Sequence, residues 1–209
     1  MANDSPRDRA FATELAYGSI KMRRTVDWYL APFVGDRSTP LPPAIAEILR
    51  LGIYEFAYTK ADEHATVFEF VNLAKKYGHK GVAGLVNAVL RSFLRDRPPA
   101  PHRDLFDSDD EYLGTLCSLP TWMVKRVRDV FPENVEAICA AVNDPPQNAI
   151  VVNRLKADVD AVSQALEAAG IGLTRSPFAD EALLTDAAAA VRARERDAHS
   201  EWWIQSESS

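Results

Sequence analysis

The sequence has little of what disulfide frameworks, metal sites and membrane spans require. It contains two cysteines and four scattered histidines in 209 residues. No CxxC, HExxH or glycine-rich phosphate loop occurs. No apolar run approaches the length of a membrane span, and the N-terminus is charged and polar rather than a secretory signal. The absence of these motifs argues against the common metal-binding, nucleotide-binding and membrane-spanning classes of protein. It predicts a cytoplasmic protein with no membrane partner.

The two cysteines, Cys117 and Cys139, also lack the setting of a nucleophile. Each falls late in a predicted helix, whereas a reactive thiol needs a neighbouring cation or a helix N-terminus. We expect both to be reduced and buried. Asp109, Asp110 and Glu111 resemble a metal cluster, but an acidic first turn of a helix is the simpler interpretation. The sequence therefore offers no catalytic and no metal-binding residues.

The net charge of −6 hides an asymmetry between the two halves of the chain. Residues 1–100 contain 14 Lys and Arg against 11 Asp and Glu, a balance of +3. Residues 101–209 contain 10 against 19, a balance of −9. Because phosphate contacts need clustered cations, a nucleic-acid surface is expected in the first half.

Helical spacing of apolar residues dominates the first half. The pattern predicts helices over 7–22 and 25–33, and a third after the TPLPP turn, in which Gly52 indicates a close contact with another helix. Two more helices follow between His64 and Arg97, the second over 80–95. No strand pattern occurs before residue 97, so residues 1–97 are predicted to form a helical bundle.

The second half begins after a proline-rich linker, predicted over residues 98–106. Helices are expected after Ser108, Pro120 and Pro132. Strands are expected at 149–155, 171–175, 182–185 and 202–204, with helices at 158–169 and 187–198. Residues 107–209 are therefore predicted to form a small α+β domain.

A basic turn joins the last two helices of the bundle. Lys75, Lys76, His79 and Lys80 lie on it. One interpretation is a solvated helix end, since lysines are favourable near a helix C-terminus. A second takes GVAG, residues 81–84, as the GxxG loop of a KH domain, although it leads straight into a long apolar face. Charge pattern alone leaves these interpretations open.

Several longer stretches resemble a known family. RDRAFATELAYG, ILRLGIYEFAY and HATVFEFVNLAKKYGHKGVAGLVNAVLRSFLR resemble the NusB-like domain that opens the Sun/Fmu (RsmB) family of bacterial ribosomal RNA cytosine-5 methyltransferases. SLPTWMVKRV, NDPPQNAIVVNRLKAD and QSESS resemble the small domain that precedes the catalytic domain in that family. The resemblance covers essentially the whole chain. It implies an all-α NusB-like helical bundle followed by a small α+β domain.

The resemblance also implies an RNA-binding role, because NusB-like domains bind RNA. Arg7 and Arg9 match the RNA-facing start of the family's first helix. The implied RNA-binding residues are Arg7, Arg9, Lys75, Lys76, His79 and Lys80. The NusB protein also binds a ribosomal protein during antitermination, so the alternative role is a NusB-like protein-interaction or transcription antitermination module.

In the family, a following Rossmann-like domain binds S-adenosylmethionine and carries two catalytic cysteines, one of them after a proline. The sequence ends at Ser209, before such a domain, and neither of its cysteines follows a proline. We therefore expect a non-catalytic region of the enzyme that holds no cofactor and is inactive alone. Its expected partners are ribosomal RNA and a catalytic methyltransferase domain in cis or in trans.

Overall fold

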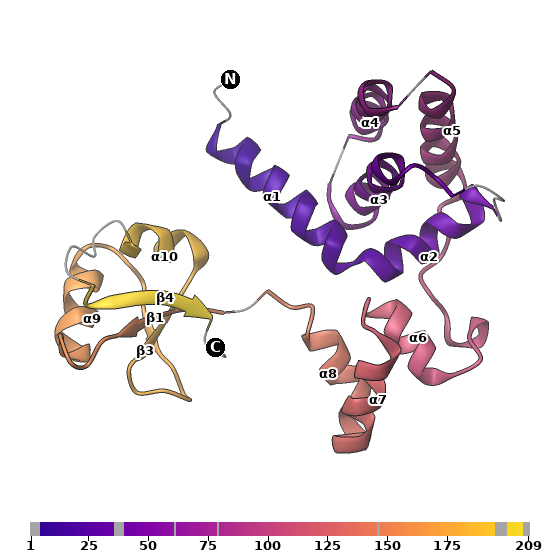
Figure 1. Cartoon of the computed structure of the whole chain (residues 1–209). Coiled ribbons are helices and arrows are strands. Elements are labelled where there is room, and N and C mark those ends of the chain that lie inside the picture. Colours follow the sequence, from indigo (N-terminus) through magenta and orange to yellow (C-terminus); the bar gives the residue numbers. More distant parts are fainter. Residues whose placement is uncertain are drawn as a thin grey trace. The chain divides into compact units, whose positions relative to one another are not determined.

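The structure is a computed structural model that describes residues 5–35, 40–60, 62–78, 80–145, 147–194 and 200–206. The chain forms two compact units, residues 1–143 and residues 144–209. The first unit is helical in its described part, and the second contains a sheet with two helices (Figure 1). This architecture confirms the predicted fold class, a helical bundle followed by a small α+β structure.

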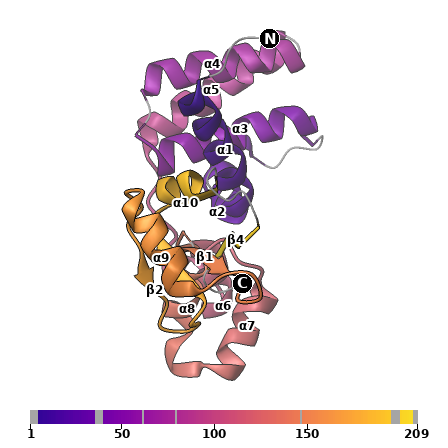
Figure 2. The same cartoon turned by 90° about the vertical axis from the view of Figure 1, so that its left-hand side faces the viewer.

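A bundle of helices forms the first part of the first unit. Its elements are α1 (Pro6–Lys21), α2 (Arg23–Val34), α3 (Pro43–Tyr58), α4 (Glu63–Tyr77) and α5 (Lys80–Asp96). α4 and α5 lie side by side in Figures 1 and 2. The predicted helices are confirmed, and no strand occurs among the described residues before 97.

Helix α3 lies at the centre of this bundle, because it packs against α1, α2, α4 and α5. Its side chains Ile45, Leu49 and Ile53 are completely buried. A Cβ atom added to Gly52 would lie 2.8 Å from Cδ2 of Leu90 on α5. The predicted close contact at Gly52 is therefore confirmed, and it lets α3 and α5 approach closely.

Three shorter helices follow in the same unit, α6 (Asp109–Leu116), α7 (Thr121–Val130) and α8 (Val135–Ala141), with short 3-10 turns at Arg103–Leu105 and Pro132–Asn134. They share a small core that contains both cysteines, which are free and buried as predicted. Asp109 and Asp110 lie in the first turn of α6 and form ion pairs with Arg128 at 2.6 and 2.7 Å. This acidic turn is thus paired with a cation, as expected of a helix start rather than a metal site.

Side chains from α2 fasten these short helices to the bundle. Arg24 donates hydrogen bonds to the Thr115 and Thr121 hydroxyls and to the Leu119 carbonyl. The Thr25 hydroxyl donates to the carbonyl of Thr115 at 2.6 Å in a buried position. These contacts explain why residues 107–143 group with the bundle.

The contacts within the structure place the boundary between the two compact units after residue 143, whereas the sequence predicted a linker at residues 98–106. The sequence placed residues 107–143 with the later strands, beyond the linker at 98–106. In the structure they pack on the bundle instead. The division into domains 1–97 and 107–209 remains a prediction about which parts fold alone.

The second unit is an antiparallel sheet in the order β2-β3-β1-β4. Its elements are β1 (Asn148–Val152), α9 (Val159–Ala168), β2 (Thr174–Arg175), β3 (Ala182–Thr185), α10 (Ala187–Arg194) and β4 (Trp202–Ser206). In the register, Ile150 of β1 lies opposite Leu183 and Ile204. Ile150 and Leu183 share a core with side chains of α9 and α10. The helices therefore cover one face of the sheet.

Two strand predictions in this unit were too long. β1 ends at Val152 because Asn153 starts a turn, in which Lys156 and Ala157 donate backbone hydrogen bonds to its carbonyl. β2 is reduced to Thr174 and Arg175. Within the described residues, no helix is long and apolar enough to cross a membrane.

Candidate nucleic-acid interface

The first predicted cluster of cations lies at the start of α1. Ser5 and Asp8 form a capping box there, in which the Ser5 hydroxyl accepts the N–H of Asp8 and the Asp8 carboxylate accepts the N–H of Ser5. The Ser5 hydroxyl and the Ser5 N–H both donate to the Asp8 carboxylate, and these two hydrogen bonds lower the pKa of Asp8. Arg7 and Arg9 are exposed on either side of it. The helix start thus presents two guanidinium groups and one carboxylate.

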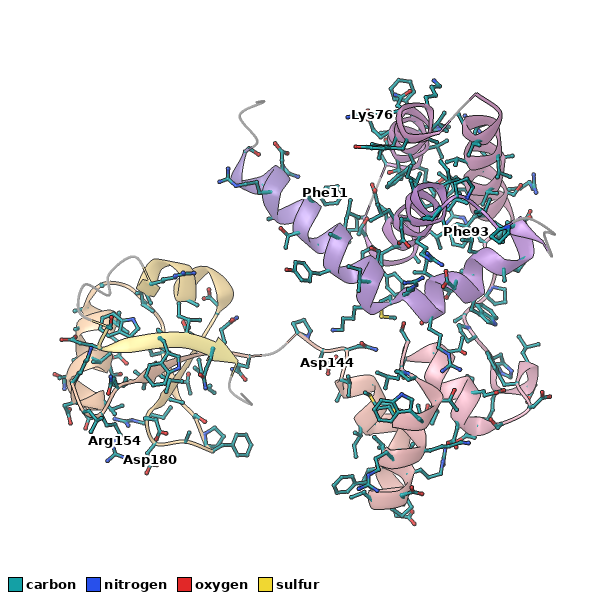
Figure 3. The ribbon with its side chains drawn as sticks, in the orientation of Figure 1. Phe11, Lys76, Phe93, Asp144, Arg154 and Asp180 are labelled. Atoms are coloured by element: carbon teal, nitrogen blue, oxygen red, sulfur yellow. The ribbon has the colours of Figure 1, made fainter. Side chains whose placement is uncertain are left out.

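The second cluster lies at the C-terminal end of α4, where Lys75 and Lys76 are both exposed. Figure 3 labels Lys76. The Lys75 ammonium donates to the side-chain oxygen of Asn72 at 3.2 Å. The Lys76 ammonium lies 5.4 Å from the centre of the Tyr77 ring, and Tyr77 is 59% exposed. A cation beside an exposed aromatic ring suits both a phosphate and a stacked base.

The structure places the described members of the predicted set on three helices. Lys75 and Lys76 lie in the last turn of α4, and Lys80 is the first residue of α5. The side chain of Lys80 and the whole of His79 lie outside the described residues. Arg7 and Arg9 belong to α1, which packs mainly against α3. The described cations of the predicted set therefore lie at the start of α1 and at the end of α4.

Exposed aromatic residues near these clusters escaped the sequence analysis. Phe68 is 63% exposed on α4, and Phe11 is 43% exposed one helical turn after Arg7. Phe68 lies outside the apolar stripe of α4, which was a usable signal. Tyr77, by contrast, continues the spacing of the buried residues Phe70 and Ala74, and only the end of the helix exposes it.

A groove lies beside the first cluster, between α1, α3 and α4, with a volume of about 720 Å³. Arg7, Phe11 and Leu15 line it from α1, and Phe70 and Leu73 line it from α4. Arg7 therefore stands at the border between the exposed basic surface and this groove.

The second unit contains a polar cleft of about 580 Å³ at the end of β1. Figure 3 labels Arg154 and Asp180 of this cleft. Three cations and three carboxylates line it: Arg154, Lys156, Arg175, Asp158, Asp160 and Asp180. Arg175 also forms an ion pair with Asp160. Because the charges balance, this cleft attracts phosphate less than the exposed ends of α1 and α4 do.

No catalytic constellation accompanies these surfaces. Among the described residues, no group of His, Cys, Asp and Glu is arranged to hold a metal ion. Burial raises the pKa of Cys117 to about 11 and also raises that of Cys139. A thiol with a raised pKa is a poor nucleophile at neutral pH.

Comparisons with known proteins identify both halves of the chain. The NusB family model matches residues 1–95, and the model for the ferredoxin-like domain of RsmF/B-like methyltransferases matches residues 119–192. The crystal structure of PH0851 has a similar fold, with a TM-score of 0.63 at 20% identity over 88% of this chain and 41% of that chain.

Curated relatives carry the name ribosomal RNA small subunit methyltransferase B. The probable enzyme of Bacillus subtilis is 34% identical over 86% of this chain, and the probable enzyme of Synechocystis is 33% identical over 84%. The enzyme of Serratia proteamaculans is 30% identical over 80% of this chain. The chain spans about 40% of the length of these relatives. With a NusB domain followed by an RsmF/B-type ferredoxin-like domain, the chain belongs to the Sun/Fmu (RsmB) family of ribosomal RNA methyltransferases and corresponds to its N-terminal part.

Proposed function

We propose that this chain binds ribosomal RNA as the non-catalytic N-terminal region of an S-adenosylmethionine-dependent ribosomal RNA (cytosine-5) methyltransferase. The observation that carries the proposal is the pair of family matches, NusB followed by the RsmF/B ferredoxin-like domain, in a chain whose relatives are named as ribosomal RNA methyltransferases. A cytoplasmic location, where ribosomal RNA is found, belongs to the same proposal.

The proposed RNA surface consists of Arg7, Arg9, Lys75, Lys76, His79 and Lys80. The exposure of Arg7, Arg9, Lys75 and Lys76 supports it, because exposed cations can replace counterions on the RNA backbone. The exposed ring of Tyr77 beside Lys76 supports it further, since unpaired bases stack on aromatic side chains.

Charge reversal at the end of α4 tests this surface. The double variant Lys75→Glu/Lys76→Glu should weaken binding to a structured fragment of small-subunit ribosomal RNA by at least about ten-fold at moderate salt. The dependence of affinity on salt should also become less steep, with the magnitude of the slope of log affinity against log salt reduced by about 1 to 2. Fluorescence anisotropy over a range of salt concentrations measures both quantities.

A matched control separates a local contact from net charge. Lys125 and Arg126 are exposed on α7, outside the proposed surface, so Lys125→Glu/Arg126→Glu changes the charge of the chain equally. It should weaken binding much less. Equal weakening by both double variants, with both proteins folded, would show that the end of α4 has no special role.

We further propose that methyl transfer requires the catalytic domain of the longer enzyme, in cis or in trans. The chain alone should neither bind S-adenosylmethionine nor methylate ribosomal RNA. Calorimetry with the cofactor and a tritium-transfer assay measure the two properties. Stoichiometric cofactor binding by this chain would overturn the proposal.

A protein-interaction role, such as a transcription antitermination module, remains the second candidate, and the groove between α1, α3 and α4 favours it. A salt titration separates the two roles, because binding through phosphates weakens steeply with salt whereas an apolar docking contact responds little.

A further inference from the structure

We propose that the groove between α1, α3 and α4 binds a cationic, amphipathic segment of a partner protein, with a lysine or arginine side chain of that segment directed at Glu55. The groove shares Arg7 with the proposed RNA surface but contains neither Lys75 nor Lys76. It adds a protein ligand to a region for which RNA binding is the main proposed function.

The walls of the groove are apolar and come from three helices. Phe11 and Leu15 of α1 face Phe70 and Leu73 of α4, and Tyr58 closes the wall from α3. Phe11 and Tyr58 are 43% and 41% exposed. Figure 3 shows Phe11 on the side of α1 that faces α3 and α4. A volume of about 720 Å³ has room for several side chains from one face of a helix.

The charges around these walls are mainly negative. Four carboxylates and two cations line the groove: Glu14, Glu55, Asp62, Glu69, Arg7 and Lys60. An excess of carboxylates repels the phosphates of RNA and attracts a ligand with positive side chains. Charge complementarity therefore favours a basic protein segment over nucleic acid in this groove.

Among the carboxylates that line the groove, Glu55 is the proposed partner of the ligand's cationic side chain. It is only 8% exposed, and the Thr66 hydroxyl donates to its Oε1 atom at 2.7 Å. Its Oε2 atom has no hydrogen-bond partner among the described residues, and it is not among the fully buried unpaired atoms. Because Glu55 lines the groove, a ligand in the groove can approach this carboxylate.

A carboxylate in this position is incompletely compensated. Burial of an ionised group is costly unless the group is paired and hydrogen-bonded. Thr66 supplies one hydrogen bond, and an ammonium or guanidinium group from a ligand would supply the counter-charge. The apolar walls would cover the stem of such a side chain, which explains why the ligand should be amphipathic.

The test uses the full chain, with methyl labels on Leu15 and Leu73, and two short peptide probes. The probes are acetyl-Leu-Arg-Leu-Leu-amide and its counterpart with Glu in place of Arg. At millimolar peptide, the Arg probe should shift both methyl resonances in a saturable way, and the Glu probe should bind at least about ten-fold more weakly.

Two variants and a control assign the binding to Glu55. Glu55→Gln keeps the size of the side chain and a hydrogen-bond acceptor for Thr66, and it should weaken the Arg probe by about ten-fold. Glu47→Gln removes an exposed carboxylate on the same helix, outside the groove, and should leave affinity unchanged. If Glu55→Gln fails to fold, Phe11→Ser on the exposed rim serves instead and should also weaken binding.

The proposal is overturned if both probes bind equally, or if neither shifts the two methyl resonances. It is also overturned if the folded Glu55→Gln variant binds the Arg probe as the wild type does, or if a uridine hexanucleotide shifts the same resonances more strongly than the Arg probe. Because Lys75→Glu/Lys76→Glu should leave peptide binding intact, failure of this site and failure of the proposed RNA surface are distinguishable.

Discussion

Arg24 should be one of the most important polar side chains for the stability of the first unit. Its guanidinium group donates to Thr115 Oγ1 at 3.2 Å, to the Leu119 carbonyl at 2.7 Å and to Thr121 Oγ1 at 2.9 Å. All three bonds are partly buried, and they join α2 to α6 and α7. At about 1 kcal/mol net for each bond, Arg24→Ala should lower the free energy of unfolding by about 3 kcal/mol.

The adjacent residue provides a matched control. The Arg23 side chain is 58% exposed, and its contact with Asp27 is long, at 3.8 Å. Arg23→Ala should therefore change stability by less than about 0.5 kcal/mol. Arg24→Lys should recover at most about 1 kcal/mol, because one ammonium group cannot reach acceptors in three directions.

Urea unfolding of the full chain, followed by circular dichroism at 222 nm, measures these differences. The reasoning would be refuted if Arg24→Ala and Arg23→Ala were equally stable. It would also be refuted if Arg24→Lys matched the wild type, because the geometry of the guanidinium group would then be irrelevant.

Three further predictions concern the bundle and the buried thiol of Cys117. Residues 1–97 alone should give a cooperative, all-helical thermal transition by circular dichroism, and a substantial strand signal or no transition would contradict this. Gly52→Val should lower the melting temperature of the full chain, because even its Cβ would lie 2.8 Å from Leu90; an unchanged melting temperature would show that the helices can separate at no cost. Folding raises the pKa of Cys117 from 9.0 to about 11, so the unfolded chain loses this proton first and stability should fall as pH rises through that window. Cys117→Ala should reduce this fall in urea titrations at alkaline pH, and an identical pH dependence in the variant would contradict the assignment.

The local sequence pattern was sufficient to predict the helices of the bundle and many of its buried residues. Apolar residues at helical spacing identified the bundle helices and their buried faces, because the period of a helix is a property of neighbouring residues. Gly52 indicated a close helix contact, and Leu90 of α5 provides it. The two cysteines were correctly assigned to the core, and longer motifs pointed to the family that the comparisons identified.

The grouping of the elements required the tertiary structure. Prolines at 98, 99 and 101 suggested a boundary, yet residues 107–143 pack on the bundle. The partners of Arg24 lie about ninety residues further along the chain, and no periodicity marks such a pair. A long-range hydrogen bond depends on where two elements meet, which neighbouring residues do not encode.

The same limit applies to the surfaces proposed for binding. The sequence by itself determined which residues carry charge, including Lys75, Lys76 and Glu55. Only the folded chain decided that the two lysines stand exposed at the end of α4, whereas Glu55 is nearly buried in the lining of a groove and accepts a hydrogen bond from Thr66. The physical reason is that burial and pairing depend on how α1, α3 and α4 pack together. The free energy with which a charged side chain binds a ligand depends in turn on that burial and pairing.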